Sequence, residues 1–126
     1  MTGIKSLGMI GFLKSFVYAF AGIVTFFRYE RNGKIQLLAA VIATIAGGLL
    51  KISMHEWMWL CACIATVLSF EMMNSVIEKI CNLVQPEYHP AVKVIKDIAA
   101  AAVLLVAIAS AVIGAIIFLP KILPLL

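Results

Sequence analysis

Residues 98–119 read IAAAAVLLVAIASAVIGAIIFL, and this stretch decides the class of fold. It holds 22 residues without a charge, and about 20 apolar residues in an α-helix cross the hydrocarbon of a bilayer. The whole chain agrees, because 64% of its 126 residues are hydrophobic and only 13% are charged. An ordinary soluble domain is roughly 45–50% apolar and about 25% charged. The composition therefore argues against a water-soluble globular protein and predicts an all-α integral membrane protein.

Two further apolar runs lie upstream, at residues 35–50 and 57–70. Each falls short of the ~20 residues that a span needs, so each must include polar neighbours at one end. For the second run, this means continuing past Glu71 and Asn74 toward Ile80. The sequence thus predicts three transmembrane helices, two of which carry polar residues into the membrane.

A fourth apolar run covers residues 15–27. It resembles a signal peptide in one respect, because residues 19–21 form an A-x-A pattern. A lysine precedes this run and aromatic residues crowd the pattern, so an amphipathic helix on the membrane surface is the better interpretation, with its cations at the lipid headgroups: Lys5, Lys14 and Arg28. We expect one membrane domain over residues 1–126, with a surface helix over about 5–28 and transmembrane helices over about 31–50, 57–81 and 97–119.

The positive charges predict the orientation of these helices. Eight of the ten Lys and Arg residues lie before the apolar run at 35–50 or between the runs at 57–70 and 98–119. The positive-inside rule makes that side cytoplasmic, which leaves the amino end inside and the carboxyl end outside. The spread of cations around apolar blocks argues against a nucleic-acid partner. The three cysteines show no CxxC spacing, so the sequence does not support a zinc or redox centre.

The most informative residues are polar side chains where a membrane helix favours apolar ones. At 100° per residue, five of them fall within an arc of about 100° on the second predicted span: Glu71, Asn74, Ser75, Glu78 and Asn82. A central carboxylate costs about 2.5–3.5 kcal/mol if it faces lipid, so Glu71 must face protein or water. Interhelical hydrogen bonds would explain one amide. Two carboxylates on one face favour a functional site with a cation, and Mg²⁺ suits such ligands best.

Other charged residues near the predicted cytoplasmic side are ambiguous by themselves. Glu30 could pair with Lys34 four residues later. Asp97 opens the third span, where the helix dipole favours an acid in any case. Lys93 and Lys96 could bind phosphates or simply anionic lipid. All these groups nevertheless converge on one cytoplasmic layer.

Longer motifs carry a resemblance to a known family. The segment EMMNSVIE at residues 71–78 is followed by PEYHP at 86–90 and by KD at 96–97. Together with ERN at 30–32 and the alanine-rich third span, this pattern resembles the small bacterial integral-membrane lipid kinases, the diacylglycerol kinase and undecaprenol kinase family. The resemblance covers nearly the whole chain. It implies a homotrimer in the bacterial cytoplasmic membrane, with three transmembrane helices and a surface helix per subunit and with active sites shared between subunits.

The resemblance also implies the reaction, which is transfer of the γ-phosphate of ATP to the hydroxyl of a membrane lipid alcohol. By position, Glu71 resembles the family's general base, and Glu30 and Glu78 resemble the ligands of the Mg²⁺ ions that bridge the phosphates. The rest of the shell around nucleotide and substrate corresponds to Asn74, Lys96 and Asp97. Carboxylates, magnesium and a lysine suffice for phosphoryl transfer, which consists mostly of positioning and charge stabilisation.

Undecaprenol is the favoured substrate, because residues 30–32 and 86–90 resemble the undecaprenol kinase branch more closely. Diacylglycerol is the alternative within the family. Asn82 stands where the family commonly has an acid, so no charged role is assigned to it. Two other classes stay open on the residues alone, an ion- or proton-conducting subunit and a structural subunit of an assembly, because intramembrane polar groups serve those functions too.

Overall fold

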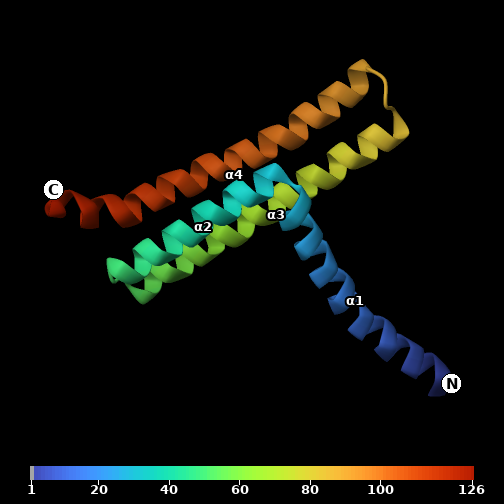
Figure 1. The fold of residues 1–126 in the computed structure, drawn as a ribbon, viewed down its shortest axis with the longest axis horizontal. Coiled ribbons are helices and arrows are strands. Elements are labelled where there is room, and N and C mark those ends of the chain that lie inside the picture. The colour runs from blue at the N-terminus through green and yellow to red at the C-terminus, as the bar shows by residue number, and fades with distance from the viewer. Residues whose placement is uncertain (1) are drawn as a thin grey trace.

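A computed structural model describes residues 2–126, with the side chains of residues 8–126. Within this range the chain forms four α-helices and a short 3₁₀ turn (Figure 1): α1 Thr2–Tyr29, α2 Arg31–Leu49, α3 Met54–Val84, α4 Pro90–Ile122 and η1 Leu123–Leu125. All four helices are long and apolar enough to cross a membrane. The all-α prediction is therefore confirmed. The predicted headgroup contact of Lys5 concerns a side chain outside the described part.

Local sequence signals explain where α3 and α4 begin. Ser53 caps α3, because its Oγ accepts a hydrogen bond from the Glu56 N–H at 3.1 Å while the Glu56 carboxylate accepts one from the Ser53 N–H at 2.9 Å. This reciprocal pair satisfies two donors that a helix start leaves open. α4 begins at Pro90, whose missing N–H is not needed in the first turn, and His89 Nδ1 accepts the N–H of Ala91. The break between the two helices therefore lies at residues 85–89, beside the prolines.

Proline has a weaker effect at the other end of α4. Pro120 follows the predicted span over about 97–119 but does not end the helix, because it lies inside α4, which continues to Ile122. A proline removes one backbone donor, and here the loss falls in the last turn. Pro124 then stands in the first turn of η1. The helix consequently reaches past the apolar run that predicts it.

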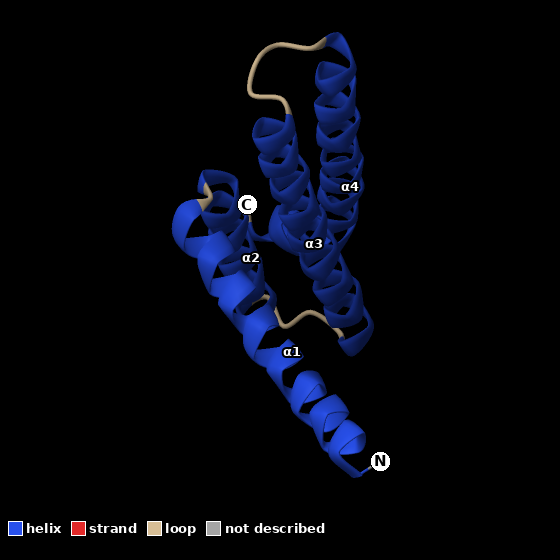
Figure 2. Ribbon diagram, turned by 90° about the vertical axis from the view of Figure 1, so that its right-hand side faces the viewer, coloured by secondary structure: helices blue, strands red, loops and turns tan. Residues whose placement is uncertain are grey.

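The central helix of the bundle is α3. It packs along α4 and against α2 in both ribbon views (Figures 1 and 2). At the end near the α2–α3 turn, a small buried cluster is formed by Ile52, Leu60 and Ile117. At the same end, Lys121 Nζ of α4 lies 3.0 Å from Glu56 Oε1 of α3. This packing holds three helices side by side and brings the polar face of α3 next to α2.

Helix α1 leaves this bundle and extends away from it (Figure 1). Its contact with α2 is close at the corner, where a Cβ on Gly33 would lie 2.7 Å from the Cε2 atom of Phe26. The other side chains described along α1 are mostly exposed and apolar. Residues 8–29 satisfy the length and composition of a membrane span. Length and composition alone therefore permit four spans where the sequence predicts three and a surface helix.

Candidate active site

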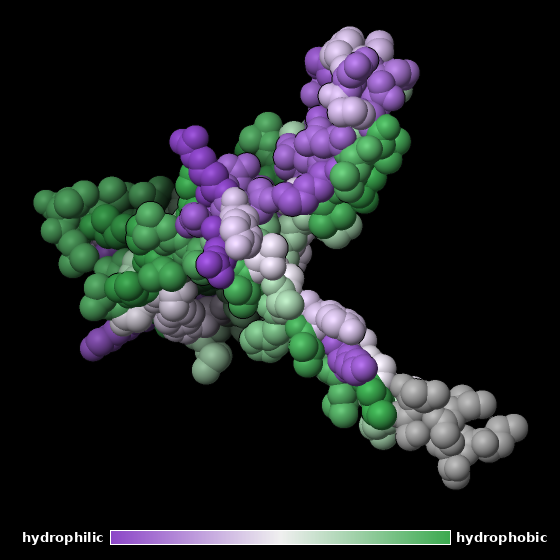
Figure 3. Space-filling model, turned by 45° about the vertical axis from the view of Figure 1, so that its right-hand side comes forward, coloured by the Kyte–Doolittle hydropathy of each residue, from purple (hydrophilic) through white to green (hydrophobic). Residues whose placement is uncertain are grey.

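Hydrophilic side chains gather around the α1–α2 corner and the α3–α4 loop, while much of the remaining visible surface is hydrophobic (Figure 3). The polar stripe of α3 runs toward this end and consists of the five residues that share one face: Glu71, Asn74, Ser75, Glu78 and Asn82. Its first members, Glu71 and Asn74, are the buried polar residues among the described side chains, with 5% and 8% of their surface exposed. Glu71 thus faces other helices and not lipid, which avoids the cost of a carboxylate in hydrocarbon.

Two polar neighbours act on the Glu71 carboxylate. Gln36 of α2 is close enough to hydrogen-bond with it, and Glu78 of α3 is close enough to repel it. Helix α2 therefore contributes the Gln36 amide next to Glu71, the first residue of the polar stripe. Glu78 itself is exposed in the single chain, although it lies on the same face of α3. Glu71 is thus enclosed by the helices of one chain, whereas Glu78 is accessible to a ligand or to a second subunit.

Asn74 has an incomplete set of hydrogen bonds. Its Oδ1 atom is buried and has no hydrogen-bond partner within the described part of the chain. Buried polar atoms in proteins are almost always paired. The buried amide therefore has the capacity to hold one more group beside Glu71.

The α1–α2 corner contributes the next carboxylate. Glu30 is the N-cap residue of α2, with an extended backbone, and its Oε1 accepts a hydrogen bond from Lys79 Nζ of α3. Both side chains line a groove of about 680 Å³ between α1 and α3, together with Tyr29 and Ser75. The pair joins residues 49 positions apart and links the corner to α3.

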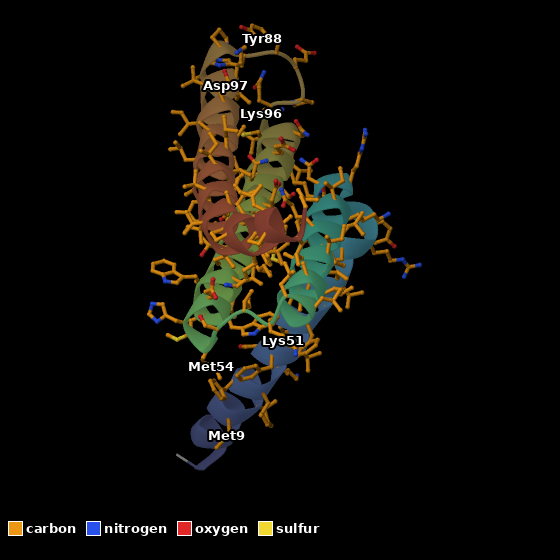
Figure 4. The ribbon with its side chains drawn as sticks, turned by 90° about the vertical axis from the view of Figure 1, so that its left-hand side faces the viewer. Met9, Lys51, Met54, Tyr88, Lys96 and Asp97 are labelled. Carbon is orange, nitrogen blue, oxygen red and sulfur yellow. The ribbon has the colours of Figure 1, made fainter. Side chains whose placement is uncertain are left out.

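Helix α4 contributes two lysines and one acid. Lys96 Nζ donates a hydrogen bond to Asn82 Oδ1 of α3 at 2.7 Å. Lys93 Nζ lies 2.6 Å from Asp97 Oδ2, one turn away, and both side chains of this pair are about 60% exposed. Figure 4 shows Lys96, Asp97 and Tyr88 at the end of the bundle opposite Lys51 and Met54. Lys96 therefore faces α3, whereas Asp97 forms its ion pair on an open surface.

One chain brings together only part of the residue set that the sequence predicts. Glu71 and Asn74 share a buried position, and Lys96 contacts the same stripe further along. Glu30 contacts Lys79 instead, while Asp97 pairs with Lys93. The partners that sequence reasoning missed are Gln36 and Lys79. Gln36 gave a faint signal as the only strongly polar residue of its apolar run, whereas nothing near Lys79 indicates a partner 49 residues away.

These residues fit a magnesium nucleotide better than a free metal ion. The described residues contain no group of three or more His, Cys, Asp or Glu side chains that could hold a metal by themselves. Magnesium needs no such cage, because it keeps several waters and binds through one or two carboxylates plus substrate phosphates. Glu30 and Glu78 supply carboxylates of this kind, and Asn74 Oδ1 is an unpaired acceptor beside Glu71. The donor set is therefore adequate once phosphates are present.

Comparison with known proteins identifies the family of this chain. The family model of prokaryotic diacylglycerol kinase matches residues 17–118. An undecaprenol kinase of Bacillus subtilis is 42% identical over 110 residues, which cover 87% of this chain and 89% of the relative. A diacylglycerol kinase of Synechocystis is 36% identical over 115 residues, which cover 90% of this chain and 66% of that protein. The chain therefore belongs to the prokaryotic diacylglycerol kinase family and is a lipid kinase with membrane helices.

Proposed function

We propose that this protein transfers the γ-phosphate of ATP to the hydroxyl of undecaprenol at the cytoplasmic face of the bacterial cell membrane. The observation that carries the proposal is Glu71, a buried carboxylate on a membrane helix with Gln36 beside it. The similarity to an undecaprenol kinase, at 42% identity over most of both chains, favours this substrate. Family membership sets aside the ion-conducting and structural alternatives.

Glu71 acts as the general base in this proposal. The lipid hydroxyl stays near the membrane because its hydrocarbon tail holds it there, so the base must lie at membrane depth. As the hydroxyl oxygen forms a bond to the γ-phosphorus, the bond from this phosphorus to the bridging oxygen breaks, and ADP leaves. The proton of the hydroxyl passes to the Glu71 carboxylate. The Gln36 amide beside this carboxylate would orient it toward the acceptor.

The remaining residues position the nucleotide. Magnesium would supply positive charge that neutralises the phosphates when it is bound with the nucleotide. Glu30 and Glu78 would hold it, and the buried Asn74 Oδ1, which has no partner in the described chain, would accept a hydrogen bond there. Lys96 turns from Asn82 to the phosphates, and Asp97 completes the shell around nucleotide and substrate. Positioning of this kind supplies most of the acceleration in phosphoryl transfer.

A homotrimer with shared sites completes this set. In one chain Glu78 is exposed and Asp97 pairs outward with Lys93, so neither encloses a nucleotide. Most large apolar side chains of the four helices are also exposed, and they need lipid or neighbouring chains to cover them. Residues of the α1–α2 corner of one subunit and α3 of another then form each site together. The amino end lies inside and the carboxyl end outside.

Diacylglycerol is the second candidate acceptor, because the Synechocystis relative is 36% identical and carries that name. A transfer assay separates the two. Purified protein receives γ-labelled ATP, magnesium and either undecaprenol or diacylglycerol in matched micelles. We expect label in the prenol at a rate at least tenfold higher, and Glu71→Gln to lose nearly all transfer while it still inserts and oligomerises. Faster labelling of diacylglycerol would reverse the substrate assignment, and full activity in Glu71→Gln would remove the base.

A further inference from the structure

Lys79 is a charged residue at the site that the mechanism above does not use. Its Nζ donates to Glu30 Oε1, so a proposed metal ligand carries a cation of its own in the free chain. The other lysines of this layer are placed differently: Lys96 contacts an amide, and Lys93 contacts an acid of its own helix. Lys79 is thus the lysine that joins α3 to the α1–α2 corner.

The surroundings of this ion pair allow the lysine to move while the glutamate stays. The Lys79 side chain is 64% exposed, whereas that of Glu30 is 25% exposed and its backbone caps α2. The pair borders the groove of about 680 Å³ between α1 and α3, and Ser75 lies in the same wall. A lysine has a long flexible stem and a compact charge, so its ammonium can turn from a carboxylate to another anion a few ångströms away.

We propose that Lys79 is a phosphate-binding residue that exchanges partners when the magnesium nucleotide binds. It neutralises Glu30 while the site holds no nucleotide. When Glu30 binds the magnesium of the nucleotide, the metal replaces the ammonium as the counter-charge, and Lys79 donates to a phosphate oxygen at the groove. This inference rests on the proposed role of Glu30 as a metal ligand.

The exchange has a consequence that a purely structural ion pair lacks. Without nucleotide, the ammonium competes with a divalent cation for Glu30, so its removal strengthens binding of the cation alone. With nucleotide, the ammonium adds attraction to phosphate, so its removal weakens binding of the nucleotide. An exposed ion pair contributes little, and each change is therefore expected to be roughly two- to fivefold. The two affinities change in opposite directions.

The experiment compares Lys79→Met, Lys79→Arg and a matched control, Lys121→Met, in the full-length protein in micelles. Lys121 also joins two helices through an ion pair with a glutamate, at the other end of the bundle. One probe is Mn²⁺ alone, followed by electron paramagnetic resonance of the free ion. The other is a non-hydrolysable ATP analogue with Mg²⁺, followed by calorimetry. Thermal unfolding of each variant reports on its stability.

We expect Lys79→Met to bind Mn²⁺ about two- to fivefold more tightly and the nucleotide about two- to fivefold more weakly. Lys79→Arg should restore nucleotide binding, and Lys121→Met should lower the unfolding temperature without changing either affinity. Equal affinities in wild type and Lys79→Met, or weaker binding of both probes, would overturn the role of Lys79. Such a result leaves the kinase proposal intact, because that proposal depends on transfer of label to a prenol and on Glu71.

Discussion

At the scale of single residues, the unpaired amide oxygen of Asn74 is expected to lower the stability of the protein while it serves the activity. An unsatisfied buried polar atom costs about 1–3 kcal/mol, and leucine has the same branched shape without that polar atom. We expect Asn74→Leu to raise the free energy of unfolding by up to about 1–3 kcal/mol and to abolish phosphate transfer. Chemical denaturation in micelles and the label-transfer assay measure the two effects. A drop in stability would show that the assembled protein already supplies a partner for Oδ1.

The two proposed metal ligands make a separate prediction. Glu30→Gln and Glu78→Gln remove a charge but keep the size of the side chain, so lipid binding should change little. A lost bond to a charged group costs about 1.5–3 kcal/mol, which weakens binding of the magnesium nucleotide roughly tenfold or more. Titration with a fluorescent ATP analogue gives the nucleotide affinity, and the lipid dependence of the rate gives KM for the acceptor. Unchanged nucleotide affinity in both variants would remove the metal assignment.

The polar residues on one helix were predictable, whereas their partners on other helices were not. The periodicity of α3 places Glu71 and Asn74 on one face, and the cost of a charge in lipid implies that this face is covered. Their burial agrees with that reasoning. The contacts of Glu71 with Gln36 and of Glu30 with Lys79 depend on how helices pack. No spacing in the sequence encodes such a distance, because tertiary packing alone sets it.

At the scale of helices, the close contact between the end of α2 and the start of α3 gives a matched pair of variants. A Cβ at Gly47 would lie 2.8 Å from Cη2 of Trp57, whereas one at Gly48 would meet no atom within 4 Å. We expect Gly47→Ala to destabilise the protein by about 1–3 kcal/mol through overpacking. Gly48→Ala should be neutral or stabilising by up to about 1 kcal/mol, since alanine favours a helix. Thermal unfolding checks both, and equal effects would contradict the packing of α2 on Trp57.

Helix bounds show the same limit of sequence reasoning as the contacts do. Apolar runs locate α2, α3 and α4, because about 20 apolar residues are needed to cross hydrocarbon. The apolar runs do not predict the helical turns that continue beyond the hydrocarbon. The start of α3 at Met54 depends on the cap formed by Ser53 and Glu56, and α4 passes Pro120 because only one donor is lost near its end.

At the scale of the whole molecule, the position of α1 relative to the membrane determines the number of spans. Its length and composition permit a span, yet Lys14 is exposed within its apolar segment. A lysine costs up to about 2.5–3.5 kcal/mol near the centre of a membrane helix, whereas at the interface its ammonium reaches the headgroups. In Figure 1, α1 also points away from the bundle and does not lie beside it. Both features favour the surface helix.

The number of spans decides on which sides the two termini lie. Three spans place the amino end and the carboxyl end on opposite sides of the membrane, whereas four place them on the same side. Starting from a variant without its three cysteines, we would introduce single cysteines at Gly8 and at Leu126 and label sealed vesicles with an impermeant maleimide. Reference positions are Glu87 in the α3–α4 loop and Met54 at the start of α3. These two lie at opposite ends of α3, so they report the two faces of the membrane.

We expect Gly8→Cys to react from the same side as Glu87→Cys, and Leu126→Cys from the same side as Met54→Cys. Reaction of Gly8→Cys from the side of Met54→Cys would make α1 a fourth span. The apolar side chains that line the groove between α1 and α3 would then lie within the bilayer, and the expected surface position of α1 would be wrong.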